Sequence, residues 1–346
     1  MTHSVLVTGG AGYIGSHMVK VLVQQGHRVT VLDNFSTGHR DAIAAAAGAA
    51  AVQVIEGDLR HPADIADAFA GRAIDVVMHF AASCYVGESV QHPAKYYENN
   101  VIGTLNLLGA MCAAGVPRLV FSSTCSTYGD PVSVPMDETH PQRPVNPYGM
   151  TKLTAERAMT DYGRAYGIHT VALRYFNAAG CDPDGNLGER HDPETHLIPL
   201  VLLEALRLRA GGNPAETRLQ VFGDDFDTPD GTCVRDYVHI ADLCAAHLLA
   251  LQRLMRGTGA GFEAFNLGTG NGYSVKDVIE TCRRVTGQDI QYRVTGRRAG
   301  DPARLVASAG LAQAELGWTP HFNALSDIVE TAWRWFSAQP AQASRG

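Results

Sequence analysis

A glycine-rich turn directly after the first apolar run places the strongest limit on how this chain can fold. Residues 4–8 form a short apolar segment typical of a buried parallel strand, and Gly9, Gly12 and Gly15 follow it. A helical pattern comes next, and such a turn lets backbone N–H groups approach a pyrophosphate at the positive end of a helix. The order of strand, turn and helix predicts a doubly wound, Rossmann-like α/β sheet that binds a dinucleotide.

An acidic residue follows the second predicted strand. Residues 28–32 form that strand, and Asp33 comes directly after it. A carboxylate there accepts hydrogen bonds from an adenosine ribose and repels a 2′-phosphate, which favours NAD over NADP. A loop residue or a helix cap is the alternative for Asp33. The same pocket is expected to continue along Asn34, Phe35, Ser36, Thr37 and Gly38.

Further apolar segments continue the alternation of strand and helix, at residues 52–56, 75–79, 118–123, 170–174 and 262–267. An adenine ring is expected beside the residues that follow the third strand, Asp58 and Leu59. The fourth strand is followed by Phe80, Ala81 and Ala82. Small residues at that point let a cofactor pass over the strand ends.

Tyr148 and Lys152 are the residues on which chemistry is expected to centre. Four residues apart on a helix, a phenol and an ammonium lie on the same face. A tyrosine has a pKa of about 10, and lowering it to about 7 requires roughly 4 kcal/mol. One cation about 4 Å away, at an effective dielectric of about 20, supplies roughly that much. Tyr148 could then act as a base, although the same spacing also occurs on exposed helices.

Thr124 follows the strand at 118–123 and could share a proton with a substrate, although hydroxyl residues after strands are also plain turn formers. The next residues are Cys125 and Ser126, neither of which is a carboxylic acid. Elimination from a sugar needs a general acid near the leaving hydroxyl. This segment offers none, which disfavours elimination chemistry.

Composition excludes several classes of partner. The formal charge is −7, and the longest cationic cluster of use is the pair Arg297–Arg298, so binding of nucleic acid or of a membrane surface is not expected. No apolar segment approaches the span of a bilayer, and no signal peptide precedes the first strand. The seven cysteines are scattered without CxxC pairs, which indicates reduced thiols in a cytoplasmic protein.

Two polar segments resemble ion-binding loops, and neither is expected to bind metal. His191, Asp192, Glu194 and His196 have a spacing that fits no established ligand pattern, so a polar loop is the interpretation. Residues 182–186 lack the central glycine and the closing glutamate of a calcium loop, so they are interpreted as a turn.

Motifs throughout the chain carry a resemblance to a known family. They are TGGAGYIGSH, LDNFSTG, EGDLR, SSTCSTYGD, PYGMTKLTAE, LRYFNAAG, ETHLIP, DGTCVRDYVH and RRAGDPARL, spread from the first strand to beyond residue 300. With these motifs the sequence resembles the extended short-chain dehydrogenase/reductase family, and within it the UDP-galactose (UDP-glucose) 4-epimerases.

The resemblance implies a seven-stranded Rossmann domain, residues 1–178 plus 236–267, and a smaller UDP-sugar-binding α/β domain, residues 179–235 plus 268–340. It implies that Tyr148 takes the proton of the sugar 4-OH while C4 gives its hydride to a resident NAD. Lys152 would hold the nicotinamide ribose, and Thr124 would be the hydroxyl partner. The 4-ketopyranose would turn over and receive the hydride on its other face, which interconverts UDP-galactose and UDP-glucose.

The resemblance also assigns ligand contacts. For NAD it adds Tyr13, Ile14, Asn99, Ser122 and Tyr175 to the residues named above. For the UDP-sugar it implies Thr124, Tyr148, Asn177, His196, Leu197, Gln220, Val221, Phe222, Arg235, Tyr237, Val275, Arg298, Asp301 and Leu305. The two arginines agree with independent reasoning, because a diphosphate needs paired cations and guanidinium groups supply planar forks. For each arginine a surface ion pair is the alternative.

Two positions depart from the family pattern. Cys84 stands where family members often carry a lysine near the cofactor, so one pyrophosphate contact is open. Leu305 stands where many carry a tyrosine against the sugar. A large ring there restricts the 2-substituent, so UDP-N-acetylglucosamine and UDP-N-acetylgalactosamine remain open as substrates.

The helix near residues 93–113 and the helix beginning at Tyr148 resemble the pair that forms the dimer interface in this family, so a homodimer is expected. Two other functions stay open. One is a nucleotide-sugar dehydratase or decarboxylase, which the missing acid after Thr124 disfavours. The other is an NAD-sensing regulator, which would need none of Thr124, Tyr148 and Lys152.

Overall fold

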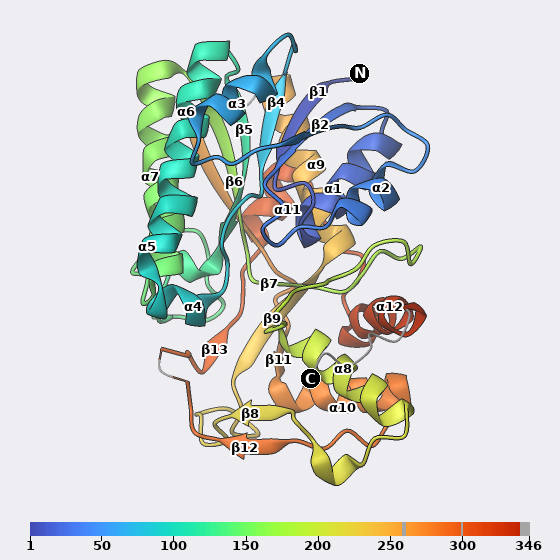
Figure 1. The fold of residues 1–346 in the computed structure, drawn as a ribbon. Coiled ribbons are helices and arrows are strands. Elements are labelled where there is room, and N and C mark those ends of the chain that lie inside the picture. Colours follow the sequence, from blue (N-terminus) through green and yellow to red (C-terminus); the bar gives the residue numbers. More distant parts are fainter. Residues whose placement is uncertain (258–260, 299, 340–346) are drawn as a thin grey trace.

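The computed structural model describes residues 1–257, 261–298 and 300–339 and shows two layered parts (Figure 1). The larger part is built on a seven-stranded, all-parallel sheet of order β10-β6-β5-β4-β1-β2-β3. Its strands are β1 (Ser4–Thr8), β2 (Arg28–Asp33), β3 (Gln53–Glu56), β4 (Val76–His79), β5 (Arg118–Thr124), β6 (His169–Tyr175) and β10 (Phe262–Leu267). This order confirms the predicted Rossmann-like fold class.

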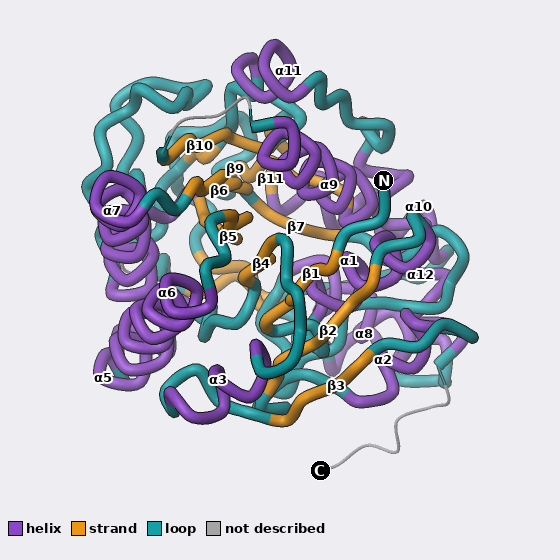
Figure 2. Tube along the Cα trace, turned by 90° about the horizontal axis from the view of Figure 1, so that it is seen from above, coloured by secondary structure: helices purple, strands orange, loops and turns teal. Residues whose placement is uncertain are grey.

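Helices cover both faces of this sheet (Figure 2). One core layer packs α1 (Tyr13–Gln24) and α9 (Ile240–Arg256) against the strands through Met18, Leu22, Leu243 and Leu251. The other packs α3 (Pro62–Phe69), α6 (Gly103–Ala114) and α7 (Pro147–Tyr166) through residues that include Ile65 and Leu107. Because both faces are covered, the central strands are largely apolar, and every residue of β1 and β4 is buried.

Strand limits agree closely with those expected from the sequence. The last strand spans the predicted residues, whereas β2 and β5 each extend by one residue, to Asp33 and Thr124. The alanine-rich segment is helical over α2 (Arg40–Ala47). Residues 86–114 are less regular than predicted: α4 (Val86–Gln91) and α5 (Pro93–Tyr96) precede the π-helix η1 (Tyr97–Ile102), which runs into α6. A 3-10 turn, η2 (Cys125–Thr127), follows β5.

The smaller part contains two short sheets. One joins β7 (Asn177–Ala179), β9 (Val234–His239), β11 (Gly272–Ser274) and β13 (Arg304–Leu305), and the other pairs β8 (Gln220–Phe222) with β12 (Arg293–Thr295). Around them lie α8 (Leu197–Arg209), η3 (Pro214–Glu216), α10 (Val275–Thr286) and α12 (Leu325–Ala338), while α11 (Gly310–Leu316) packs on the larger part (Figure 1). Apolar side chains of α8, α10 and α12 form a separate core.

The boundary expected at residue 236 falls inside β9, which pairs with β7, β11 and β13 rather than with the seven-stranded sheet. The end expected at residue 340 lies outside the described residues. The two-domain division itself remains a prediction. β9 and its partners join the two parts, because α9 follows β9 directly and packs on the large sheet.

Candidate active site

Tyr148 and Lys152 lie in the first turns of α7, where the helix meets the end of β5. Asn146 caps the helix by accepting a hydrogen bond from the Gly149 amide at 2.8 Å, and Pro147 occupies the first helical position. These local signals fix where α7 begins. They therefore fix the face from which Tyr148 and Lys152 project.

Lys152 is held on the strand end. Its Nζ donates to the Ser122 carbonyl oxygen at 2.8 Å and lies 4.8 Å from the centre of the Phe121 ring. The side chain is 3% exposed, and burial lowers the pKa of Lys152 to about 8, while the nearby Cys84 and Glu156 oppose that shift. The ammonium is thus buried with one direct hydrogen bond and has donors left for a ligand.

Tyr148 is also buried, and burial raises the pKa of its hydroxyl well above the ordinary value. Cys84 and Tyr175 raise it further, and a hydrogen bond with Thr124 lowers it. The structure thus joins Tyr148 and Thr124, as the sequence predicts. Burial is the largest cause of this rise, and the lowered tyrosine pKa expected beside Lys152 stays a prediction.

A buried polar network fixes α7 against β5 and β6 one helical turn beyond Lys152. Glu156 forms an ion pair with Arg174 at 2.7 Å and accepts a hydrogen bond from Ser123 Oγ at 2.6 Å. Arg174 also donates to the Tyr128 hydroxyl at 3.0 Å. Sequence reasoning missed these positions. Glu156 falls four residues after Lys152, which is the one signal that could have suggested it.

A second support comes from the π-helix η1, a type of distortion that is frequent at functional sites. Asn100 is buried, and its side chain bonds to the Ser83 amide at 2.8 Å and to Thr151 Oγ1 at 3.1 Å. It ties the segment after β4 to α7. Asn99, the predicted cofactor residue, donates to Asn100 at 3.0 Å. Asn100 therefore supports α7 from inside the fold.

The glycine turn fits a dinucleotide phosphate. A Cβ on Gly15 would lie 2.1 Å from the Gly9 oxygen, and a Cβ on Gly9 would lie 2.5 Å from the Ala81 nitrogen, so both glycines are required by packing. At Gly12 the nearest atom would be 3.4 Å away. A pocket of about 240 Å³ opens beside Gly12 and Tyr13, and no side chain caps the start of α1. These free helix amides are an anion site.

Asp33 lies at the end of β2 and is buried. One carboxylate oxygen accepts from the Ala11 amide and the other from the Phe35 amide, each at 2.8 Å. Burial raises the pKa of Asp33, and these two hydrogen bonds oppose the rise. Asp33 therefore caps the loop and still keeps lone pairs for a ribose, since a carboxylate offers about four acceptor sites.

The remaining predicted cofactor residues lie around this turn. Asn34 donates to Asp58 at 2.8 Å, which itself pairs with Arg60, and the Arg60 guanidinium holds the pKa of Asp58 well below its usual range. Tyr13 donates to the Gly180 carbonyl at 2.6 Å, and Ser122 Oγ bonds to the Tyr175 hydroxyl. The structure thus brings together residues from the ends of four strands of the large sheet, namely β2, β3, β5 and β6.

Predicted substrate residues gather on β9, β13 and the segment before β13. Arg235 forms an ion pair with Asp301, and Leu305 is paired with Arg235 across β9 and β13. Asn177 donates to the Asp236 carbonyl at 3.1 Å, and Tyr237 is buried two residues along β9 from Arg235. Arg235 does form an ion pair, as the alternative proposed, but its side chain is only 12% exposed and its partner is another predicted substrate residue.

Arg298 stacks on Phe222, with the guanidinium carbon 3.8 Å from the ring centre. The stacking brings together two predicted substrate residues that are far apart in the sequence. Gln220 is exposed on β8, whereas Val221 is buried in the second core and Val275 packs against that core. His196 and Leu197 lie at the start of α8.

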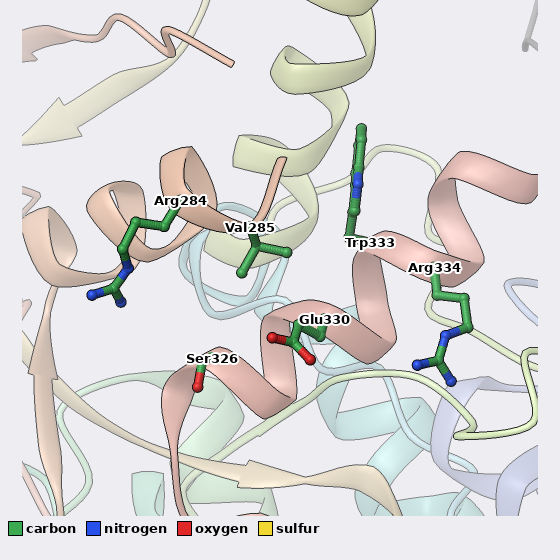
Figure 3. A pocket seen from close by; sticks show the side chains of 6 residues that line it. All are labelled: Arg284, Val285, Ser326, Glu330, Trp333 and Arg334. Atoms are coloured by element: carbon green, nitrogen blue, oxygen red, sulfur yellow. The ribbon is translucent and has the colours of Figure 1, made fainter. Parts of the chain in front are cut away.

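A separate pocket of about 490 Å³ lies between α10 and α12 (Figure 3). Its lining side chains are Arg284, Val285, Ser326, Glu330, Trp333 and Arg334. It contains none of the predicted site residues. The chemistry is therefore assigned to the α7 site.

Comparison with known proteins identifies the family. The chain matches the model of the NAD dependent epimerase/dehydratase family over residues 5–268. The chain belongs to this family. A UDP-glucose 4-epimerase of Halalkalibacterium halodurans is 50% identical over 337 residues, which cover 97% of this chain and 96% of that protein. The resemblance inferred from the motifs is confirmed.

Solved structures give the same result. A crystal structure of a UDP-glucose 4-epimerase is 47% identical, covers 98% of each chain and superposes with a TM-score of 0.90. The UDP-glucose 4-epimerase of Brucella ovis, crystallised in complex with NAD, is 46% identical to this chain. The match covers 96% of this chain and 98% of that one, with a TM-score of 0.88. Among the described residues no helix is long and apolar enough to cross a membrane.

Proposed function

We propose that this chain interconverts UDP-galactose and UDP-glucose by epimerisation at C4 through a 4-ketopyranose. The observation that carries the proposal is the meeting of Thr124, Tyr148 and Lys152 at the end of β5, beside a glycine turn with an open anion site. Relatives about half identical over nearly the full chain are UDP-glucose 4-epimerases, and one was crystallised with NAD. An enzyme using NAD is thus the function that both observations support.

The chain's own groups account for the proton steps. Tyr148 Oη takes the proton of the sugar 4-OH and returns it after the ring has turned over. Thr124, bonded to Tyr148, shares that proton and orients the hydroxyl. Lys152 stabilises the phenolate by its charge, and Ser122 holds Lys152 in place through its carbonyl oxygen. No residue needs to change its net protonation over one complete turnover.

NAD, when bound, supplies a reversible acceptor for the hydride of sugar C4 and a positive ring charge. The amides in the first turn of α1 would hold its diphosphate, and Asp33 its adenosine ribose. A positive charge nearby would favour the phenolate of Tyr148, whose pKa burial raises in the protein alone.

The test is direct. Purified holoenzyme is mixed with UDP-galactose, and nucleotide sugars are separated over time while NADH absorbance is followed. Formation of UDP-glucose with constant NADH is expected. A product lacking a hydroxyl group would indicate a dehydratase. No turnover would leave the NAD-sensing function or a decarboxylase, since a decarboxylase needs a sugar that carries a carboxylate.

N-acetylated UDP-sugars are a second candidate substrate class, and Leu305 is the observation that favours testing them. Leu305 is paired beside Arg235 at the predicted sugar wall, and it is smaller than an aromatic ring. The same assay with UDP-N-acetylgalactosamine measures this tolerance. UDP-glucose and UDP-galactose remain the proposed main pair.

We also propose a homodimer in the cytoplasm. Exposed apolar side chains cluster on η1, α6 and α7: Tyr97, Ile102, Leu105 and Met150 are each at least 37% exposed. These elements lie on one side of the molecule (Figure 1). A second copy would bury them, as such faces usually require. All seven cysteines, each among the described residues, are free, in line with a reducing compartment. Sedimentation analysis tests the dimer.

A further inference from the structure

The loop between β7 and α8 gathers four metal-ligating side chains outside the groups used above for proton transfer. They are Glu189, His191, Glu194 and His196, and one ligand atom of each lies within 4.8 Å of those of the other three. The sequence pattern considered His191, Asp192, Glu194 and His196 and fitted no known ligand spacing. The fold brings in Glu189 and leaves Asp192 outside the group.

The geometry suits four-coordinate binding. His191 Nδ1 lies 3.5 Å from a carboxylate oxygen of Glu189 and 3.4 Å from one of Glu194, while His196 Nδ1 contacts Glu189. Bonds of about 2.0–2.1 Å in a tetrahedral site place neighbouring ligand atoms about 3.3–3.4 Å apart. Two of the observed separations are close to that edge, whereas the His196–Glu189 contact is shorter and would lengthen on binding an ion.

His191 provides an independent observation. Its Nδ1 is buried and has no hydrogen-bond partner of normal geometry, although it points at the two carboxylates. The rings of Tyr13 and Tyr85 flank it edge-on at 6.3 and 5.9 Å. A buried ring nitrogen without a hydrogen bond costs free energy. An ion bonded to that nitrogen would remove this cost.

The carboxylates of Glu189 and Glu194 also favour a bound cation. The carboxylates of Glu189 and Glu194 are 3% and 8% exposed, and two such buried charges repel each other. A divalent cation would balance both carboxylates.

We propose that Glu189, His191, Glu194 and His196 bind one divalent transition-metal ion, with Zn²⁺ as the best match. Two imidazole nitrogens and two carboxylate oxygens are ligands that zinc accepts in a tetrahedron, whereas magnesium and calcium prefer oxygen alone. The ion would connect the loop to His196, the residue directly before α8. It is not required by the epimerisation chemistry.

One consequence rests on the proposed function. His196 and the adjacent Leu197 are predicted to contact the UDP-sugar, so an ion that occupies His196 competes with substrate. Zn²⁺ is therefore expected to raise the apparent KM for UDP-galactose, and a chelator is expected to restore it. Metal binding itself is measured without turnover, so failure of the epimerase assay would leave this site standing.

The experiment titrates Co²⁺ into tag-free, chelator-treated holoenzyme and records visible absorption. One equivalent is expected to give the intense bands of four-coordinate Co²⁺ without the near-ultraviolet charge-transfer band of a thiolate, and Zn²⁺ should displace it. His191→Ala and Glu194→Gln should each weaken binding at least about tenfold. The matched control is His321→Ala, an exposed histidine elsewhere, which should bind like the parent.

Thermal unfolding and NAD content establish that each variant is folded, and Glu194→Gln keeps the test open if His191→Ala unfolds. The proposal is overturned by weak, six-coordinate spectra equal to those of free Co²⁺, or by bands that persist unchanged in both variants. Loss of the bands in His321→Ala as well would also overturn it.

Discussion

The cofactor half and the substrate half of the site hold their predicted ligand groups in different ways. In the cofactor half, Asp33 and Lys152 are fixed by hydrogen bonds to backbone atoms of a single sheet and its loops. In the substrate half, Arg235 pairs with Asp301 and Arg298 stacks on Phe222, so predicted ligand groups hold one another. The predicted cofactor ligands are thus held by the fold itself, whereas the predicted substrate ligands would exchange contacts with one another for contacts with a ligand.

This difference agrees with the two kinds of ligand. A resident cofactor is best served by a preformed site, because no ordering free energy is lost at each turnover. A sugar ring that must turn over between two hydride steps needs a binding region that can release it. Contacts between Arg235 and Asp301 keep both charges paired when the sugar nucleotide is absent. The comparison predicts that changes in the two halves affect different kinetic parameters.

The largest effect is expected from Tyr148→Phe. Removing the hydroxyl removes the proposed base while the ring still fills its buried position, so kcat should fall about 10²- to 10⁴-fold. NAD content should stay near that of the parent, because the cofactor half is fixed elsewhere. The measurements are the epimerase assay and NAD released on denaturation. Turnover close to the parent value would refute the assignment of Tyr148.

The second prediction concerns Lys152 and pH. Burial lowers its pKa to about 8, so the ammonium is present below that pH and is lost above it. Epimerase kcat/KM should therefore fall as pH rises through about 8 or slightly lower, since a bound nicotinamide charge lowers the pKa further. Lys152→Arg should be slower, but its rate should not fall over that range because guanidinium stays protonated. Lys95→Arg, at an exposed lysine, is the control.

The lowered pKa of Lys152 also predicts how the free energy of unfolding changes with pH. Between about pH 8 and 10.5 the unfolded chain binds a proton at Lys152 that the folded chain does not. The contribution of Lys152 to the free energy of unfolding therefore increases with pH across that window. In Lys152→Met this increase should be absent from a comparison of denaturation curves. An unchanged pH dependence in Lys152→Met would contradict the buried ammonium.

Much of the cofactor half could be predicted from sequence because its signals are local. Gly9, Gly12 and Gly15 follow one strand, and Asp33 follows the next, so spacing alone places them at one sheet edge. Strand limits were predictable for the same reason, since buried parallel strands are continuous apolar runs. The π-helix η1 was not predictable, because its extra residue per turn depends on how Asn100 packs between Ser83 and Thr151.

The substrate half is harder to predict from sequence. β9 returns to a small sheet whose strands come from four separate segments, so Arg235, Asp301 and Leu305 meet only through tertiary pairing. Without the family resemblance, nothing in the spacing would have paired Arg298 with Phe222. The sequence also could not show how deeply Tyr148 is buried, and burial raises the pKa of its hydroxyl.

The third prediction tests the substrate half alone. Arg235→Gln should raise KM for UDP-galactose about tenfold or more, because a hydrogen bond to a charged phosphate is worth about 1.5–3 kcal/mol. The change in kcat should stay within a few-fold. Arg207→Gln is the matched control, since Arg207 also pairs with an acidic residue, Glu204, but lies on α8 away from the predicted ligands. A fall in kcat with unchanged KM would place Arg235 in the chemistry instead.

The smallest effect is expected at an exposed ion pair that links α1 to the turn at residues 182–186. Lys20 on α1 bonds to both Asp182 and Asp184 at 2.7 Å, and these occupy the turn at residues 182–186 that was considered as a calcium loop. Asp184 is 67% exposed, so Asp184→Asn should lower the free energy of unfolding by no more than about 0.5 kcal/mol. Asp182 is 7% exposed, and Asp182→Asn should cost about 1–3 kcal/mol. Urea denaturation of both variants measures the difference, and equal losses would mean that burial does not set the strength of this link between the halves.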